Sequence, residues 1–186
     1  MVNFLRSLSV LVIIMLMVTL QVVLTRYFPR LGMLDLPLIA VIYLTIAKES
    51  LLWPIFSGSA IGFLQDSLSL SALGMNGFTK ISIGCLAYLA NSIFAVDRVL
   101  TRFGLLFLSS ILATLLFLLL RIMFLNRNEV IDGQRLLLSG AVNALVGLPL
   151  FYLFDKIVKS PNEYVWISKT FSRIRNSSNP ESRLFR

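Results

Sequence analysis

Three polar residues, Asp66, Asn76 and Lys80, stand in strongly apolar surroundings, where they could bind a ligand, relay a proton or join helices. A carboxylate near the end of an apolar segment needs a partner or water. Two interpretations of Asp66 follow: it caps the next turn or pairs with Lys80, or it lines a partner groove or a polar cavity. A proton relay is disfavoured, because a relay normally contains several buried acids and this sequence shows one.

The residue types that common catalytic sites need are missing from the sequence. The chain has no histidine and one cysteine, Cys85, which excludes histidine-based metal sites, Ser–His and Cys–His catalysis, and an internal disulfide. The run Gly-Ser-Ala-Ile-Gly at 58–62 is not a nucleophile elbow. No HExxH motif and no glycine-rich phosphate loop occurs. We therefore expect a protein without enzymatic activity, metal or cofactor.

The amino-acid composition is typical of a membrane protein. Of the 186 residues, 57% are hydrophobic and 14% are charged, and the mean hydropathy is +0.85, whereas soluble domains carry about 25% charged residues. Half of the net charge of +8 lies after Phe154, so it indicates membrane orientation and not a nucleic-acid partner. Because a span takes about 20 residues, the length admits about six spans and no large domain outside the membrane.

Charged residues mark the ends of the apolar segments. They predict an all-α integral membrane protein, a bundle of about six transmembrane helices in one domain, residues 1–158. The expected spans are residues 5–25, 35–48, 50–66, 74–96, 101–123 and 136–155, with five spans as the alternative. Asp35 followed by Pro37 predicts a helix start, because a side-chain acceptor is followed by a residue that needs no N–H. The segment 67–73 is expected to be an interfacial turn or a re-entrant piece.

Residues 159–186 are predicted to form a basic cytoplasmic tail. With six spans, eleven of the 17 basic residues lie on the side of the termini and six on the other. The side richer in Lys and Arg is cytoplasmic, so both termini are predicted to be cytoplasmic. The tail fixes this topology or, alternatively, forms a surface helix over 164–174 against anionic lipid or a partner.

Small residues predict which helices pack closely, because helices in lipid associate through small side chains and interhelical hydrogen bonds. The third segment carries Gly58 and Gly62, the fourth carries Gly74 and Gly77, and the sixth carries Asn143 among further small residues. We therefore expect the third, fourth and sixth segments to form the packed centre. The first and fifth are expected to face lipid. Asn143 is expected to bridge helices, with ligand contact as the alternative.

Three motifs follow one another within residues 34–80. They are Leu-Asp-Leu-Pro at 34–37, Gly-x-x-x-Gly-Phe-Leu-Gln-Asp at 58–66 and Leu-Gly-Met-Asn-Gly at 73–77. This order resembles the rod shape-determining membrane protein family MreD, and outside these residues the resemblance is one of hydropathy. The chain departs from the family in the turn at 67–72, which lacks the glycine or proline often found there, and in its longer basic tail.

This resemblance implies a non-catalytic subunit of the bacterial cell-elongation machinery, which acts in rod shape and peptidoglycan synthesis at the inner membrane. Its implied partners are a single-span MreC-like protein and the RodA–PBP2 synthase, with RodZ, MreB and membrane lipid as further contacts. The candidates for partner binding or packing are Gly58, Gly62, Asp66, Gly74, Asn76, Lys80 and Asn143.

An alternative function comes from the fold that the resemblance implies. The family's fold is thought to resemble the substrate-binding S-components of energy-coupling-factor vitamin transporters. A protein of that kind would have a polar-rimmed cavity in which several aromatic and hydrogen-bonding groups converge. The sequence predicts few such groups on the outer side: Asn76, Lys80, Asn126 and Asn128.

Overall fold

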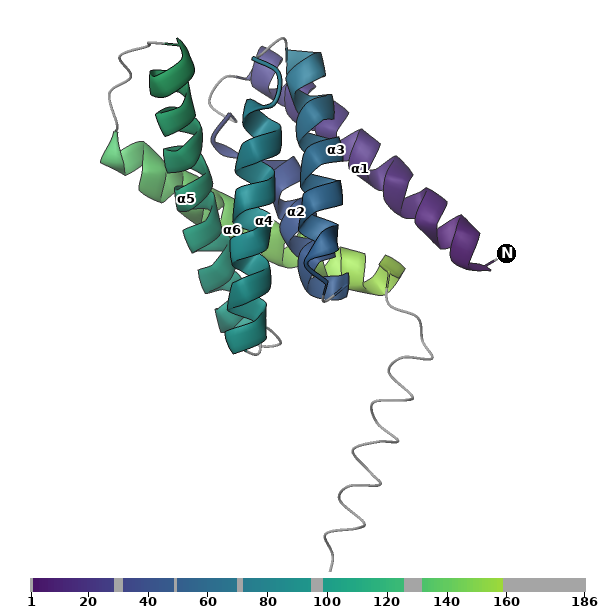
Figure 1. Ribbon diagram of the computed structural model, residues 1–186. Coiled ribbons are helices and arrows are strands. Elements are labelled where there is room, and N and C mark those ends of the chain that lie inside the picture. The colour runs from purple at the N-terminus through teal and green to yellow at the C-terminus, as the bar shows by residue number, and fades with distance from the viewer. Residues whose placement is uncertain are drawn as a thin grey trace, which may run out of the picture. The chain divides into compact units, whose positions relative to one another are not determined.

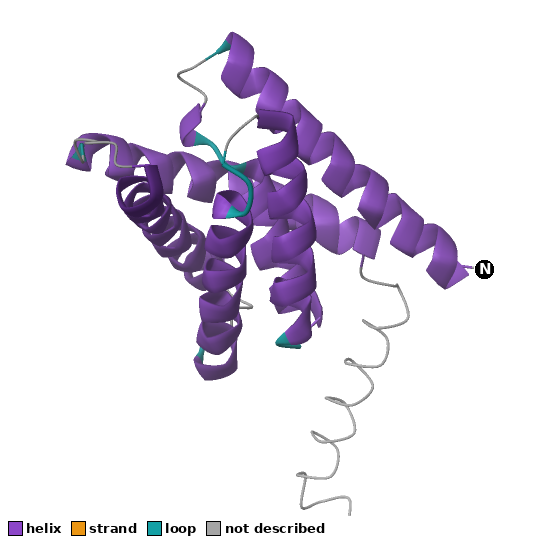
Figure 2. Ribbon diagram, turned by 45° about the horizontal axis from the view of Figure 1, so that its top comes forward, coloured by secondary structure: helices purple, strands orange, loops and turns teal. Residues whose placement is uncertain are grey.

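The computed structural model describes residues 2–28, 32–48, 50–69, 72–94, 99–125 and 132–158. Within these ranges the regular structure is helical and contains no strand (Figures 1 and 2). The helices are α1 (Val2–Tyr27), α2 (Leu36–Lys48), α3 (Leu52–Ser69), α4 (Met75–Ile93), α5 (Val99–Leu125) and α6 (Gly133–Val158). The predicted tail, including 164–174, lies outside the described residues, as do Asn126 and Asn128.

The chain divides into two compact units. The first, Met1–Phe151, contains α1 to α5 and most of α6, and every contact described below lies within it. Of the second unit, Tyr152–Arg186, the described part is the final stretch of α6.

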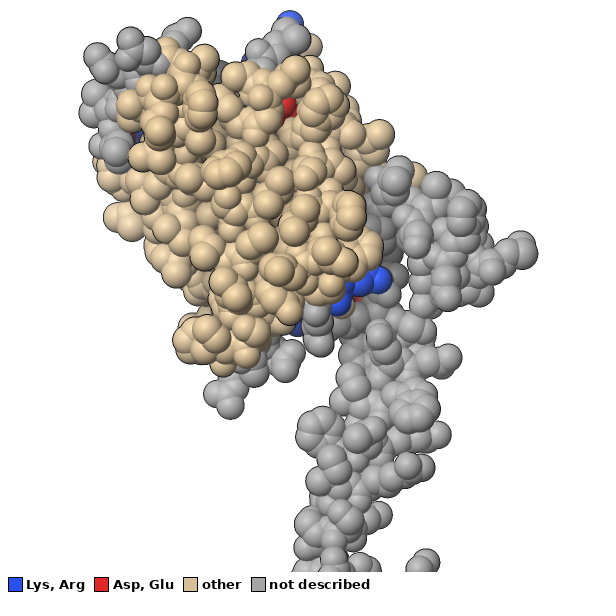
Figure 3. Space-filling view, in the orientation of Figure 1, with Lys and Arg blue, Asp and Glu red and all other residues tan. Residues whose placement is uncertain are grey.

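Two of the described helices are long and apolar enough to cross a membrane, Val99–Leu125 and Gly133–Lys156. Shorter apolar helices occupy Ile14–Tyr27 and Leu36–Lys48. Many large apolar side chains face outward, for example Phe56 on α3, and the molecular face in Figure 3 is tan across its middle, with charged side chains towards its ends. A lipid-exposed surface has this pattern, since charges are costly within the hydrocarbon region.

Helix α2 is the most enclosed element of the described residues, although the sequence places the packed centre in the third, fourth and sixth segments. Ten consecutive residues of α2, from Leu36 to Thr45, are buried. A helix that is buried on every side can be apolar on every side, and α2 has that composition. Val41 of α2 packs with Val18 of α1 and Ile61 of α3 in one apolar cluster. The central position of α2 was missed because its few small residues gave no packing signal.

The start of α2 is capped as the sequence predicts. The Asp35 carboxylate accepts the N–H of Leu38 at 3.0 Å, the third residue of the helix. Pro37 lies in the first turn, where a missing N–H leaves no hydrogen bond unmade. The cap therefore satisfies one of the donors that every helix leaves open at its N-terminus.

Helices α3 and α4 run antiparallel, side by side (Figures 1 and 2). Helix α3 continues to Ser69, and α4 begins at Met75 after a turn at Leu73 and Gly74. The first three residues of the expected 67–73 turn are therefore helical, because α3 continues three residues past Asp66. The short connection keeps the end of α3 beside the start of α4.

Candidate functional site

Asp66 is fully buried and caps the start of α4 from the neighbouring helix. Its carboxylate accepts the backbone N–H of Gly74 at 2.8 Å and that of Asn76 at 3.3 Å. The Asn76 side-chain amide donates to the same carboxylate at 2.6 Å. The cap comes from α3 because the N-cap residue, Gly74, has a φ of 94° and no side chain of its own. Glycine adopts this left-handed conformation at little cost.

Lys80 is 1% exposed, and its ammonium lies 3.2 Å from the Asp35 carboxylate. The ion pair joins α4 to the cap of α2, so one carboxylate of Asp35 serves both a helix start and a buried cation. Of the two arrangements predicted for Asp66, the structure shows the cap, and the ion pair that it shows for Lys80 is with Asp35. The sequence favoured Asp66 as the partner of Lys80 because it is nearer in the chain. Asp35 is 45 residues away in the chain but adjacent in space.

The turn before α2 is held from two sides by buried amides. Gln21 of α1 donates to the carbonyl oxygen of Leu34 and accepts the N–H of Leu36 at 3.3 Å. The side-chain oxygen of Asn143, on α6, accepts the N–H of Asp35 at 2.8 Å. Its side-chain N–H₂ group donates to the backbone carbonyl of Met33 at 3.0 Å. The predicted bridging role of Asn143 is thus seen, as a link from α6 to the turn at the start of α2.

The glycines of α3 face the backbone of α4. A Cβ atom built on Gly62 would lie 2.2 Å from the Cα of Gly77, and one built on Gly58 would lie 2.8 Å from the N of Ile81. Real Cβ atoms essentially never come this close to another heavy atom. Gly58 and Gly62, candidates for partner binding or for packing, therefore serve in the packing of α3 against α4. Gly74 differs, because a Cβ atom added to it would have no neighbour within 4 Å, and only its φ requires glycine.

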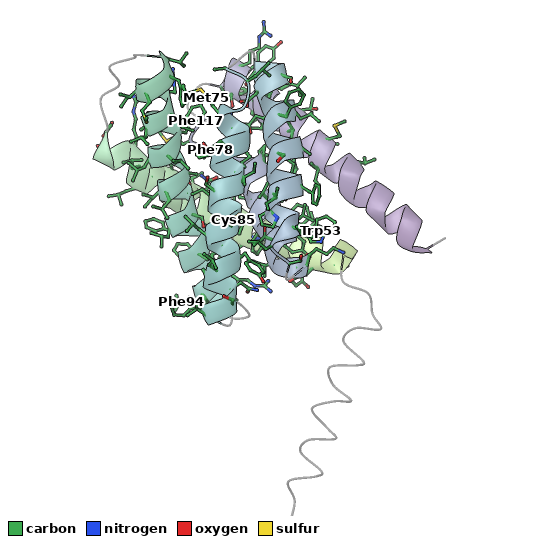
Figure 4. The ribbon with its side chains drawn as sticks, viewed as in Figure 1. Trp53, Met75, Phe78, Cys85, Phe94 and Phe117 are labelled. Carbon is green, nitrogen blue, oxygen red and sulfur yellow. The ribbon has the colours of Figure 1, made fainter. Side chains whose placement is uncertain are left out.

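A cavity of about 870 Å³ opens beside these groups. Every described helix contributes to its lining, α1 and α2 through Gln21 and Leu38, for example, and α6 through Asn143. Figure 4 labels Met75 and Phe117, which line it from α4 and α5, at the end of these helices opposite Trp53 and Phe94. Of the polar residues predicted for such a cavity, Asn76 lines it and Lys80 does not, and the lining includes Gln21, Gln65, Ser110 and Ser139, which the sequence did not single out. Isolated serine and glutamine residues in apolar segments are weak sequence signals.

The deep polar groups of this cavity are already hydrogen-bonded within the chain. Asn143 donates to the hydroxyl of Ser110 at 2.7 Å, and the hydroxyl of Ser139 donates to the carbonyl of Met33 at 3.1 Å. Nearer the opening, the buried side-chain oxygen Oε1 of Gln65 receives no hydrogen bond from the described residues. These groups can cap a helix, anchor the turn before α2 and bind a ligand through hydrogen bonds. Among the described residues no cluster of His, Cys, Asp and Glu suited to a metal ion is present.

These observations define a protein whose described residues are helical, with helices suited to a membrane and with buried side chains of Gln21, Asp66, Lys80 and Asn143 that join one helix to another. The chain belongs to the MreD family, because the family model of the rod shape-determining protein MreD matches residues 1–157. Membership gives it a role in determining rod shape, in a family of membrane proteins that is not a known enzyme family. Neither a curated protein nor a solved structure matches the chain.

Proposed function

We propose that this protein is a non-catalytic scaffold of the cell-elongation machinery, which holds a single-span MreC-like protein and the RodA–PBP2 synthase together in the inner membrane. The observation that carries this proposal is the family match over residues 1–157. RodZ, MreB and the membrane lipid are further contacts of the same assembly. The proposal places the protein in the membrane with six spans and both termini in the cytoplasm.

The α3–α4 pair is the proposed docking element. The backbone of α4 fills the space beside Gly58 and Gly62. The inward face of α3, which carries these glycines, is therefore not available to a partner. The outward face of α3 carries Phe56 and Phe63, which are 68% and 61% exposed, and α4 carries Phe78, which is 54% exposed. A partner's span would pack against this outward face, and the rigid glycine contact behind it would keep the two helices in register.

Site-specific photocrosslinking in rod-shaped cells tests the docking element. A photoreactive residue at Phe56, Phe63 or Phe78 is expected to crosslink to an epitope-tagged MreC-like protein. The same residue at Ile122, an exposed position on α5, is the matched control and is expected to give at least a tenfold weaker product. Equal yields from both faces, or none from α3 and α4, would contradict the docking element.

A shape assay tests the scaffold role itself. Gly62→Leu and Asp66→Ala are expected to convert rods to rounded cells, because both changes disturb the α3–α4 pair. Gly104→Ala is the control, since no atom lies within 4 Å of a Cβ at that position, and its cells should remain rods. If cells with both disruptive changes stay rod-shaped at a normal level of the protein, the mechanism is wrong.

A vitamin-binding subunit, similar to the S-components of energy-coupling-factor transporters, is the second candidate function. The cavity of about 870 Å³ favours it, because ligand sites commonly occupy about 300–1,000 Å³. Against it stand the hydrogen bonds that the deep polar groups already make with the chain. Equilibrium dialysis of the purified protein against B vitamins distinguishes the two functions, and micromolar or tighter binding would favour the transporter subunit.

A further inference from the structure

We propose that the cavity holds one membrane phospholipid, with its phosphate head group at the rim and an acyl chain in the interior. The ligand class is an amphiphile that combines a phosphate ester, a hydrogen-bond donor and a hydrocarbon chain. This inference does not depend on the partners proposed above. It follows from the position of the opening, the division of the lining and the chemistry of the rim.

The cavity opens at one end of the helices. Its exposed lining residues lie at helix ends or in turns, among them Ser69 at the end of α3, Leu125 at the end of α5 and Asp132 just before α6. Its buried lining residues lie deeper, such as Ser110, which precedes Leu125 by roughly 22 Å of helix at 1.5 Å per residue. The cavity therefore reaches roughly 22 Å along α5, a distance comparable with much of the hydrocarbon thickness of a bilayer, about 30 Å.

The interior offers packing but few free hydrogen-bonding groups. Leu38, Met75, Ala113, Phe117 and Leu118 provide apolar surface from α2, α4 and α5. The deep polar side chains make hydrogen bonds to the turn before α2 or to one another. A strongly polar ligand would lose its hydration here without gaining partners. A hydrocarbon chain has no hydrogen bonds to water to lose on entering the cavity. The interior therefore favours an acyl chain over a strongly polar ligand.

The rim has the opposite character. Arg121 lies with its guanidinium carbon 5.9 Å from the Phe117 ring centroid. Arg135 pairs with Asp132 at 3.3 Å across highly exposed side chains, and such an exposed pair is weak enough to exchange partners. Arginine binds phosphate oxygens through two parallel N–H groups. Gln65, whose side-chain oxygen Oε1 is buried and receives no hydrogen bond from the described residues, lines the cavity beside this rim.

Native mass spectrometry of the full chain in detergent tests the proposal. After delipidation, the protein is titrated with phosphatidylglycerol or phosphatidylethanolamine, and in separate arms with diacylglycerol and with soluble glycerol 3-phosphate. We expect one phospholipid per chain, with at least tenfold weaker binding of diacylglycerol, which lacks the phosphate, and of glycerol 3-phosphate, which lacks the chains. Equal binding of diacylglycerol or of glycerol 3-phosphate would overturn the assignment of a phospholipid, as would tighter binding of a vitamin than of the phospholipid.

Two sets of variants locate the bound lipid. Ala113→Phe fills the interior and is expected to lower phospholipid binding at least tenfold, while Ala60→Phe, on the exposed face of α3, leaves it unchanged. The double variant Arg121→Gln/Arg135→Gln should lower binding by a similar factor. Its charge-matched control is Lys48→Gln/Lys156→Gln, which removes two exposed positive charges from residues that do not line the cavity. If Ala113→Phe does not fold, the arginine variants decide. Unchanged binding in the folded cavity variants means that the lipid binds elsewhere, and the proposal is then wrong.

Discussion

Gly62 of α3 and Gly77 of α4 approach so closely that a Cβ atom on Gly62 would stand 2.2 Å from the Cα of Gly77. The obstacle is backbone, so it cannot be relieved by a change of rotamer. Close backbone contact increases the dispersion attraction between helices, which is the main attraction available in lipid. The pair therefore fixes the distance between the two helices and, through them, the position of the Asp66 cap.

The first prediction concerns this contact. Gly62→Ala is expected to destabilise the protein, by about 1–3 kcal/mol for an overpacked site, because α3 and α4 must separate to admit the methyl group. Gly104→Ala is the matched control and is expected to stabilise by about 0.5–1 kcal/mol, since it gains helix propensity without a clash. Unfolding in mixed micelles titrated with SDS measures both. A neutral Gly62→Ala would contradict the close contact.

The second prediction concerns the coupling between Asp66 and Asn76. Each single alanine variant leaves buried donors or acceptors unpaired, at a cost of about 1–3 kcal/mol for each group. Because both side chains belong to one network, the double variant should cost less than the sum of the two single variants. We expect a coupling free energy of about 0.5–3 kcal/mol from the double-mutant cycle.

The control for this cycle pairs Asp66→Ala with Gly104→Ala. The two sites lie on separate helices with no shared partner among the described residues, so their effects should add within about 0.3–0.5 kcal/mol. Asp66→Asn should fall between the wild type and Asp66→Ala, because the amide keeps one acceptor but presents an N–H₂ group to the donors of α4. A double-mutant cycle without coupling would show that Asn76 takes no part in the cap.

Local sequence signals predicted the features that depend on nearby residues. The cap at Asp35 and the helical nature of all six segments follow from residues within one or two turns. The central position of α2 and the pair of Asp35 with Lys80 were not predictable in this way, because each depends on which helices meet in space. Gln21 was overlooked for the same reason: one glutamine in an apolar run becomes informative only when the turn that it anchors is known.

The third prediction concerns the ion pair of Lys80 with Asp35. Lys80→Met removes the buried cation and leaves a carboxylate that is 30% exposed. We expect a loss at or below the low end of the about 3–5 kcal/mol seen when a buried pair is broken from one side. The double variant Asp35→Asn/Lys80→Met should recover part of this loss, because asparagine removes the unpaired charge and keeps an oxygen for the Leu38 N–H.

The measurement is again unfolding in SDS-containing micelles, with circular dichroism as the readout of helix content. Lys48→Met is the matched control, because Lys48 is an exposed lysine at the end of α2. It should change the free energy of unfolding by less than about 0.5 kcal/mol. A double variant less stable than Lys80→Met alone would mean that the Asp35 charge itself supports the fold.

The fourth prediction concerns the sidedness of α4. Its 19 residues span roughly 28 Å, close to the thickness of the hydrocarbon core, so residues just outside its two ends should meet water on opposite sides. Leu73 and Phe94 occupy these positions and are 67% and 61% exposed. The proposed topology puts Leu73, with the opening of the cavity, outside the cytoplasm. The single native cysteine makes a cysteine-free background available through Cys85→Ser.

In that background, Leu73→Cys is expected to react in intact cells with a maleimide that enters the periplasm but cannot cross the inner membrane. Phe94→Cys should react only after the inner membrane is permeabilised, which also controls for the reactivity of its thiol. The reverse pattern would place the termini outside the cytoplasm. Labelling of both positions in intact cells would mean that α4 does not cross the membrane, since a spanning helix of this length cannot expose both ends to one side.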